Sequence, residues 1–525
     1  MSAEPATDPR PDRFSLALDL ATALLLAVAL TRLAQQASTA RWFTDECFHA
    51  RLSSLLAATH QLPRTLPEFY GGLFTYYPPL FHVFGAVTIS AFGAPALREL
   101  NVGLWAVLLV TLWVGLGSGL PRPARRTAVL LCLSNHWLAL HAVRLYGELL
   151  FATLVLAAGL LALRLTRTSR IADAIGLGVV AGLMTLAKPA GAAAIPLALA
   201  TAGVLAWRRH SGPARRWLIA AAIAIGIGAP YWLRNLREFG SALYPLGAPD
   251  RDRELWALTL ETFGGSTARY FTRVADGLGP WLLGAAVLAL GLAIRRRRVD
   301  HVTALVIGLA GAIAIAPLFP IHDPRHVLVL VPLLAVAVSA GILNGWPVRA
   351  GRWVQVGVWI VAAIHVARLP EYRRPLDLPA HLAAAYEAVK QHTSEHAKLL
   401  SLWTYDTAYY TGRAATWPIP WGQERRPIEP FRATDPVAFA AALDRAGIDA
   451  LLVPIAPPPE RFNGANYPRS FVRNVSALLD DGQLELSWSS PTLALVVRAA
   501  PRDSADAPRA TPAARDSETP DRRRE

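Results

Sequence analysis

The stretch Arg41-Trp-Phe-Thr-Asp45-Glu46-Cys-Phe-His49-Ala-Arg51 follows an apolar segment at residues 15–35. Because about 20 apolar residues in a helix cross the hydrocarbon layer of a bilayer, residues 15–35 are long enough to span a membrane. From Asp45 onward, Phe48, Leu52, Leu55 and Leu56 recur at helical spacing, with Thr44 in position to cap the helix. This pattern predicts a short amphipathic helix that lies on the membrane and opens with two carboxylates.

The composition of the whole chain agrees with a membrane protein. Of its 525 residues, 53% are hydrophobic and 17% are charged, whereas soluble domains have about 25% charged residues. The net charge of +14 alone could indicate a nucleic-acid partner. However, the basic residues cluster between apolar segments, as at the cytoplasmic ends of transmembrane helices, so we expect no nucleic-acid partner. The two cysteines, Cys47 and Cys132, support neither a disulfide framework nor a thiolate metal site.

About eleven apolar segments are long enough to span the bilayer, which predicts an all-α polytopic protein of the inner or plasma membrane. After residues 15–35, these are 99–119, 127–143, 148–165, 172–187, 190–207, 217–234, 280–294, 302–318, 326–343 and 353–367. Lys and Arg remain on the cytoplasmic side, which places residues 1–13 inside and both the loop 37–97 and the chain after about residue 368 outside. The apolar piece Pro78 to Phe92 breaks the alternation, and we expect an outer-leaflet or re-entrant helix there. A signal peptide ending at Ser38-Thr39-Ala40 is an alternative for the first segment, and it also leaves Asp45 outside.

Residues 368–499 differ in character from the transmembrane domain at 14–367. Short apolar runs predict buried strands at Lys398–Trp403 and Ala450–Val453, and a helix at Pro436–Ala446. This pattern is typical of a small α/β domain, which the topology places on the extracytoplasmic side. Residues 500–525 show no apolar periodicity, which predicts a disordered tail.

The residues alone leave two interpretations of the pair Asp45 and Glu46 open. Acids in a first helical turn often complement the helix macrodipole. Asp45 and His49 also share one helix face, so they could instead bind a substrate or a metal together. The chain has no glycine-rich phosphate loop of either common form, so a nucleotide site has no visible location.

Taken with the loop that ends in Tyr76-Tyr77-Pro78-Pro79-Leu80-Phe81, the acidic pair resembles the GT-C superfamily of integral-membrane glycosyltransferases. The resemblance is greatest to the glycosyltransferase family 39-like branch, which includes protein O-mannosyltransferases and lipid A aminoarabinose transferases. It covers roughly residues 15–345. Further motifs agree in order, namely Arg144-Leu-Tyr-Gly-Glu148, Leu186-Ala-Lys188-Pro189, Pro230-Tyr-Trp-Leu-Arg234-Asn235 and Asp323-Pro-Arg325-His326. In the predicted topology, all of these motifs lie at the outer face.

The resemblance implies a GT-C fold and transfer of a sugar from a polyprenyl-phosphate donor to a lipid, glycan or protein acceptor on the outer side. An acceptor hydroxyl has a pKa far above neutrality, so it needs a positioned carboxylate as general base. Asp45 is the candidate base, with Glu46 and Glu148 as further acids of the site. A single displacement that needs only one base implies inversion at the anomeric carbon.

The leaving group is an anionic polyprenyl phosphate, which basic side chains at outer helix ends are suited to hold. The candidates are Arg234, Arg325, His326, Lys188 and Arg144, while Tyr76 and Tyr77 would shape the wall of the cavity. Each candidate also has a structural interpretation. The arginines could extend to the membrane interface, Lys188 could mark a loop before Pro189, and Glu148 could pair with Arg144. A divalent metal bound by Asp45 and His49 is a further open alternative.

A transporter or lipid flippase is the rival from another class. It would predict internal repeats and polar residues at the bilayer midplane, whereas the charges of interest here gather at one face. A catalytically inactive sensor or assembly protein with the same fold is a third hypothesis, and the presence of Asp45, Glu46, Arg234 and Arg325 counts against it.

Overall fold

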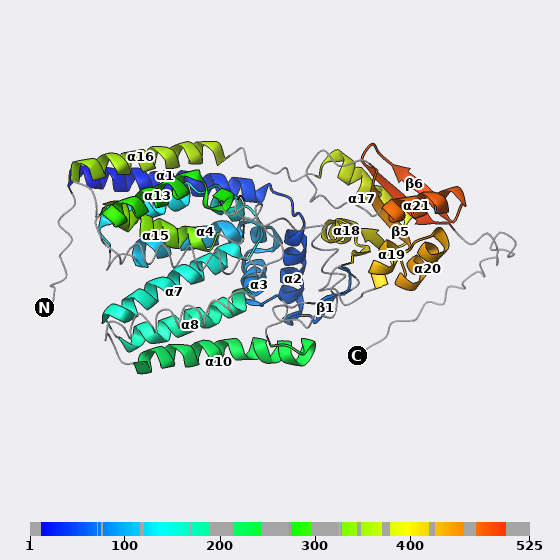
Figure 1. Cartoon of the computed structure of the whole chain (residues 1–525), viewed down its shortest axis with the longest axis horizontal. Helices are drawn as coiled ribbons and strands as arrows, with labels where there is room; N and C mark the ends of the chain where they lie inside the picture. The colour runs from blue at the N-terminus through cyan, green and yellow to red at the C-terminus, as the bar shows by residue number, and fades with distance from the viewer. Residues whose placement is uncertain are drawn as a thin grey trace, which may run out of the picture.

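The computed structural model describes residues 12–70, 72–74, 77–115, 120–168, 170–188, 214–242, 272, 275–295, 325, 328–343, 348–369, 378–418, 426–455 and 469–499. In this part of the chain, a bundle of helices along the long axis adjoins a smaller α/β domain (Figure 1). The predicted spans at 190–207 and 302–318 and the predicted tail at 500–525 lie outside the described residues, as do residues 1–11.

Most helices of the bundle run nearly parallel to one another, while α2 and α3 stand across the end that faces the α/β domain (Figure 1). The helices are α1 (Arg13–Ser38), α2 (Asp45–Thr59), α3 (Leu80–Phe92), η1 (Ala94–Glu99), α4 (Leu100–Gly115), α5 (Arg122–Leu133), α6 (His136–Ala142), α7 (Glu148–Thr168), α8 (Ile171–Ala187), α10 (Ala214–Phe239), α13 (Pro280–Arg295), α15 (Leu330–Leu343) and α16 (Val348–Arg368). Helix α8 packs against α7 and α10, α15 packs against α5 and α13, and α2 packs against α3.

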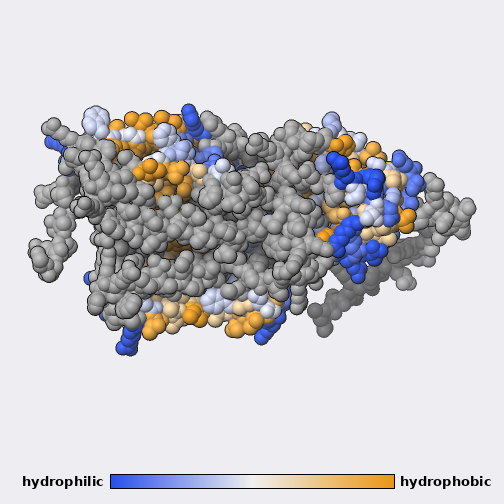
Figure 2. All heavy atoms as spheres, in the orientation of Figure 1, coloured by the Kyte–Doolittle hydropathy of each residue, from blue (hydrophilic) through white to orange (hydrophobic). Residues whose placement is uncertain are grey.

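Apolar side chains cover much of the outside of this bundle. Leu24 of α1 is 67% exposed, Val110 of α4 is 60% exposed and Leu218 of α10 is 68% exposed. Figure 2 shows hydrophobic residues along two opposite edges of the bundle, over α16 and over α10. By length and composition, three helices of the described chain can cross a membrane, namely Arg13–Ser38, Ala94–Gly115 and Arg215–Phe239. The chain is therefore an integral membrane protein, and the larger number of spans remains a prediction.

The prediction of one continuous span at residues 127–143 is wrong. Helix α5 ends at Leu133 and α6 begins at His136. Between them, the side chain of Asn135 caps α6 by accepting a hydrogen bond from the Leu138 N–H (2.9 Å). Its amide nitrogen donates to the carbonyl of Leu278 (2.9 Å). Because Asn135 satisfies these backbone groups at the break, the chain can stop one helix and start another inside a buried region.

Two glycines bring α8 and α10 into close contact. A Cβ added at Gly182 would lie 2.6 Å from the Cβ of Ile227, and one added at Gly178 would lie 2.6 Å from the carbonyl oxygen of Ala220. Small residues four positions apart let helix backbones approach closely in membranes. This contact fixes the position of α8, and thereby that of Lys188, which directly follows the helix.

The α/β domain is built on a five-stranded sheet with the order β4-β3-β5-β7-β6. Strands β3, β4 and β5 are parallel, whereas β7 is antiparallel to both β5 and β6. Its elements are α17 (Ala380–His392), β3 (Lys398–Ser401), α18 (Thr404–Thr411), β4 (Ala414–Thr416), η5 (Arg426–Ile428), α19 (Glu429–Arg432), α20 (Pro436–Ala446), β5 (Ala450–Pro454), α21 (Arg469–Asp480), β6 (Leu484–Ser489) and β7 (Leu493–Arg498). The strand predicted at Ala450–Val453 and the helix at Pro436–Ala446 are confirmed, whereas the strand predicted at Lys398–Trp403 ends at Ser401, before α18 begins.

The segment between α2 and α3 joins the bundle to the edge of this sheet. It contains a short antiparallel pair, β1 (Thr65–Leu66) and β2 (Leu73–Phe74). Between these strands, Phe69 forms a parallel bridge with Ala415 of β4. The Tyr70 N–H donates to the Ala415 carbonyl (2.7 Å), and the Ala415 N–H donates to the Glu68 carbonyl (2.9 Å). Helix α18 packs directly on α2, so the α/β domain contacts the helix that begins at Asp45.

Candidate functional site

Helix α2 begins at Asp45 through an unusual backbone conformation. Thr44 has a φ of 52°, in the left-handed region that a β-branched residue rarely adopts. The expectation that the Thr44 side chain caps α2 is wrong, because no such hydrogen bond forms. Its hydroxyl lies 3.2 Å from the hydroxyl of Tyr146, so it joins α2 to the turn before α7 instead.

Four charged side chains predicted to belong to the site meet at this point. The Arg325 guanidinium lies 2.9 Å from Oδ2 of Asp45, and its Nε lies 3.8 Å from Oε1 of Glu148. The Lys188 ammonium donates to the same Glu148 oxygen at 2.6 Å. Glu148 is buried, whereas Asp45, Arg325 and Lys188 each keep about a fifth of the side chain exposed. The cluster contains two carboxylates and two cations in hydrogen-bond or ion-pair contact, and three of the four reach solvent.

Three members of the cluster lie at helix ends, and the fourth, Arg325, lies five residues before α15. Asp45 and Glu148 are the first residues of α2 and α7, Lys188 directly follows α8, and Arg325 precedes α15. Acidic residues at helix N-termini face the positive end of the helix dipole, which favours their ionised forms. The sequence prediction that these residues share one face of the membrane domain agrees with their meeting in one cluster.

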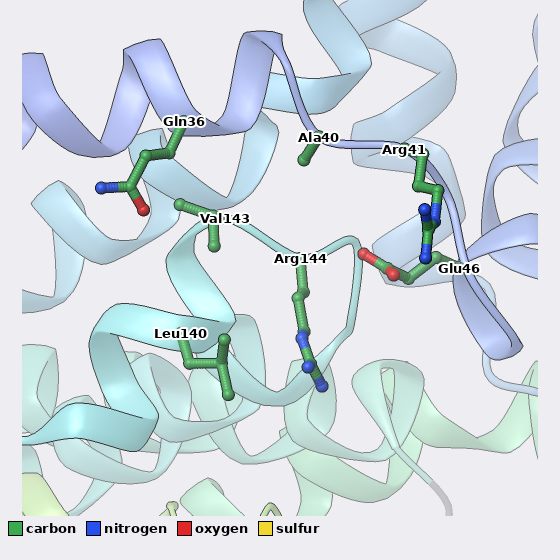
Figure 3. A pocket seen from close by; sticks show the side chains of 7 residues that line it. All are labelled: Gln36, Ala40, Arg41, Glu46, Leu140, Val143 and Arg144. Atoms are coloured by element: carbon green, nitrogen blue, oxygen red, sulfur yellow. The ribbon is translucent and has the colours of Figure 1, made fainter. Parts of the chain in front are cut away.

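Glu46 faces the other side of α2. Its side chain is 1% exposed, and Oε1 accepts a hydrogen bond from the Leu145 N–H at 2.9 Å. Figure 3 shows the Glu46 carboxylate between the side chains of Arg41 and Arg144. The same small pocket is also lined by Gln36, Ala40, Leu140 and Val143. Glu46 thus ties the start of α2 to the turn that leads into α7, which suits it to orient Asp45.

His49 lies in an aromatic environment one helical turn beyond Asp45. Its Nδ1 is 2.9 Å from Nε2 of His82, and its ring centroid is 5.5 Å from that of Tyr77 and 5.4 Å from that of Phe81. Burial lowers the pKa of His49 to about 3, although the nearby carboxylate of Glu148 acts in the opposite direction. His49 is therefore neutral at physiological pH.

The two possible metal ligands, Asp45 and His49, each contact another side chain. Asp45 is bonded to Arg325, and the imidazole of His49 is bonded to His82. In the ranges that the structure describes, no three His, Cys, Asp or Glu side chains gather in a way that could hold a metal ion. A divalent metal bound by Asp45 and His49 stays an open alternative.

The remaining predicted residues lie as follows. Arg234 is near the end of α10, where its guanidinium carbon is 6.0 Å from the ring centroid of Phe239. In the same turn, Glu238 forms an ion pair with Arg64 of the first loop (2.7 Å). Tyr76 and His326 lie outside the described residues. A phosphate-binding role for Arg234 stays a prediction.

The fold is shared with solved membrane proteins, although no protein-family model and no curated protein matches the chain. ArnT from Cupriavidus metallidurans, solved with bound undecaprenyl phosphate, is 14% identical with a TM-score of 0.60, over 93% of this chain and 98% of ArnT. The oligosaccharyltransferase AglB from Archaeoglobus fulgidus, solved with an inhibitory peptide and a dolichol-phosphate, is 10% identical with a TM-score of 0.57, over 85% and 70%. A further structure of the A. fulgidus enzyme, in complex with Zn and sulfate, is 12% identical with a TM-score of 0.56, over 83% and 68%.

The chain has the GT-C fold. The resemblance inferred from the order of the sequence motifs is thereby confirmed at the level of the fold.

Sequence reasoning missed two residues that contact Thr44 or the charged cluster. Tyr146 lies under the Arg325 guanidinium, 5.2 Å from the ring centroid to the guanidinium carbon, and burial raises the pKa of its phenol. Asp406 of α18 is 2% exposed, and both of its carboxylate oxygens accept from the Thr44 N–H, at 3.1 and 3.2 Å. Tyr146 lies inside a motif that was recognised, whereas Asp406 is 362 positions from Thr44 and no local pattern connects them.

Proposed function

We propose that the chain is a membrane glycosyltransferase that transfers a sugar from a polyprenyl-phosphate donor to an acceptor hydroxyl on the extracytoplasmic side. The observation that carries this proposal is the meeting of Asp45, Glu148, Lys188 and Arg325 in one cluster of ion pairs. The GT-C fold supports it, as do the undecaprenyl phosphate bound to ArnT and the dolichol-phosphate bound to AglB. The acceptor is a lipid, a glycan or a protein.

In the proposed reaction, Asp45 takes the proton of the acceptor hydroxyl as the hydroxyl oxygen attacks the anomeric carbon. The bond between that carbon and the phosphate oxygen breaks, and its electron pair stays on the phosphate. Arg325 and Lys188 stabilise the charge that develops on the departing phosphate. A single displacement of this kind inverts the anomeric configuration.

In the proposed reaction, binding of the donor also releases the Asp45 carboxylate from its ion pair. Asp45 is bonded to Arg325 at 2.9 Å. A donor phosphate that binds Arg325 competes with Asp45 for the same guanidinium, and this releases the carboxylate for the acceptor. Glu148 keeps Lys188 close to the same place through its 2.6 Å contact.

The test is transfer of radiolabelled sugar from polyprenyl-phosphate donors to a membrane extract by the purified full-length chain. Asp45→Asn keeps the shape of the side chain but removes the base, so turnover is expected to fall about 100-fold to 10,000-fold. The matched control is Asp435→Asn, since Asp435 caps α20 in the α/β domain and asparagine also caps helices well. Equal turnover in Asp45→Asn and wild type would remove Asp45 from the mechanism. Absence of turnover in the wild type with every donor would favour the transporter.

A further inference from the structure

The α/β domain holds the residue immediately before the proposed base. The carboxylate of Asp406 in α18 accepts the Thr44 N–H through both oxygens, at 3.1 and 3.2 Å. Asp406 is 2% exposed, so this hydrogen bond is shielded from water.

The backbone at Thr44 needs such support. A β-branched residue at a φ of 52° is held in a sparsely populated conformation, which costs about 1–3 kcal/mol and persists only where its surroundings enforce it. Thr44 is held from two sides, by Asp406 at its N–H and by Tyr146 at its hydroxyl. Since Asp45 is the next residue, this conformation sets the direction in which α2 starts.

Other contacts keep α18 on the same loop. The Tyr410 hydroxyl donates to the carbonyl of Trp42 at 2.7 Å. The ring of Tyr405 packs against three aromatic side chains of the loop and of α2, with centroid distances of 5.9 Å to Phe48, 5.3 Å to Phe69 and 5.1 Å to Tyr70. Asp406 is therefore fixed relative to Thr44 by its neighbours on both sides.

We propose that Asp406 is a positioning residue, which holds the Thr44 backbone so that α2 presents Asp45 to the reacting groups. The α/β domain thereby takes part in the reaction without contacting the substrate. The proposal rests on the function proposed above, because it needs Asp45 to be the base.

The test compares the steady-state kinetics of wild type, Asp406→Asn, Asp449→Asn and Asp45→Asn in the full-length purified chain. A small misplacement of a reacting group costs up to about 100-fold in rate, so Asp406→Asn is expected to lower kcat by about 10-fold to 100-fold, with little change in the KM for the donor. Asp449→Asn is the matched control, because the Asp449 carboxylate also accepts a backbone N–H, that of Lys398 at 2.8 Å. It lies in the same domain, and its kcat is expected to match the wild type.

A rescue experiment separates positioning from a structural role. Glycine adopts positive φ without the penalty of threonine, so Thr44→Gly combined with Asp406→Asn is expected to recover part of the kcat lost in Asp406→Asn. A purely structural role for Asp406 would lower the melting temperature and would not be rescued. Such a result, or a wild-type kcat in Asp406→Asn, would overturn the proposal.

If Asp406→Asn does not fold, a second variant tests the positioning role. Tyr410→Phe removes only the hydrogen bond to the Trp42 carbonyl, and a lower kcat with an unchanged KM is expected. An unchanged kcat in Tyr410→Phe would then overturn the proposal. Failure of the proposed function is recognised separately, because in that case Asp45→Asn would turn over like the wild type, or the wild type would transfer no sugar from any donor.

Discussion

Replacement of Lys188 by methionine is expected to destabilise the protein, because it removes the closest cation from a buried carboxylate. The Glu148 side chain is 6% exposed, and its Oε1 lies 2.6 Å from the Lys188 ammonium and 3.8 Å from Nε of Arg325. Removal of one partner from a buried ion pair costs about 3–5 kcal/mol. Here Arg325 remains close and Lys188 is partly exposed, so we expect roughly 2 kcal/mol.

The assay is thermal unfolding of the solubilised chain, followed by intrinsic tryptophan fluorescence. A double variant, Lys188→Met with Glu148→Gln, removes both charges and leaves no uncompensated carboxylate. It is therefore expected to unfold at a higher temperature than Lys188→Met alone. Lys390→Met on α17 is the control, because Lys390 is exposed and lies 3.8 Å from Glu387 in a pair that is also exposed. A pair of this kind contributes at most about 1 kcal/mol.

Two results would refute this reasoning. If Lys188→Met unfolds at the wild-type temperature, the contact with Glu148 contributes nothing to stability. If the double variant is less stable than Lys188→Met, the cost does not arise from an unpaired carboxylate, and a packing role of the lysine stem has to replace the electrostatic account.

Two further predictions concern residues around the site. The pKa of His49 is about 3 in the folded chain, against an ordinary value of 6.5 in the unfolded chain. As the pH drops, the unfolded chain therefore binds the proton first. The free energy of unfolding then falls by roughly 1.4 kcal/mol per pH unit between pH 6.5 and pH 3. His49→Gln should therefore reduce the loss of melting temperature between about pH 7 and pH 5.5, and an unchanged loss would show that another group titrates. Gly182→Ala is expected to destabilise α8 against α10 by about 1–3 kcal/mol, whereas Gly226→Ala, which meets no atom within 4 Å, should be neutral or stabilise the helix by up to about 1 kcal/mol. Equal melting temperatures of these two variants would contradict the close contact of the helices.

Local signals explain which elements could be predicted from the sequence. The helix predicted at Pro436–Ala446 has the same bounds in the structure. Asp435 caps it, proline opens it, and Gly447 ends it in a left-handed conformation, so all its stop and start signals are local. The break at Asn135 could not be predicted in this way. Asn135 stands between Ser134 and His136 in an otherwise apolar segment, and its role depends on carbonyls supplied by residues 277 and 278.

For the candidate site, the sequence indicates which charged residues belong to it but not how they pair. Charges next to apolar segments are costly near a membrane, so Asp45, Glu148, Lys188 and Arg325 stand out in the sequence. Their pairing does not follow from it. Pairing with Arg144 was one interpretation of Glu148, and the structure places Lys188 at 2.6 Å and Arg325 at 3.8 Å from its carboxylate. Helical spacing does not relate Arg144 to Glu148, because Arg144 lies in the turn before α7.

Asp406 shows most clearly why part of the site is invisible in the sequence. It stands in a short helix of a domain whose sequence carries no catalytic motif, and its effect is exerted on a backbone N–H, a group that every residue except proline has. Recognition of its role needs two facts that only the fold supplies: that α18 packs on α2, and that Thr44 has a positive φ. A side chain that positions a catalytic residue through backbone contacts leaves no pattern of its own, so the α/β domain would be taken for a structural support on sequence alone. The kinetics of Asp406→Asn therefore test whether this domain also tunes the reaction.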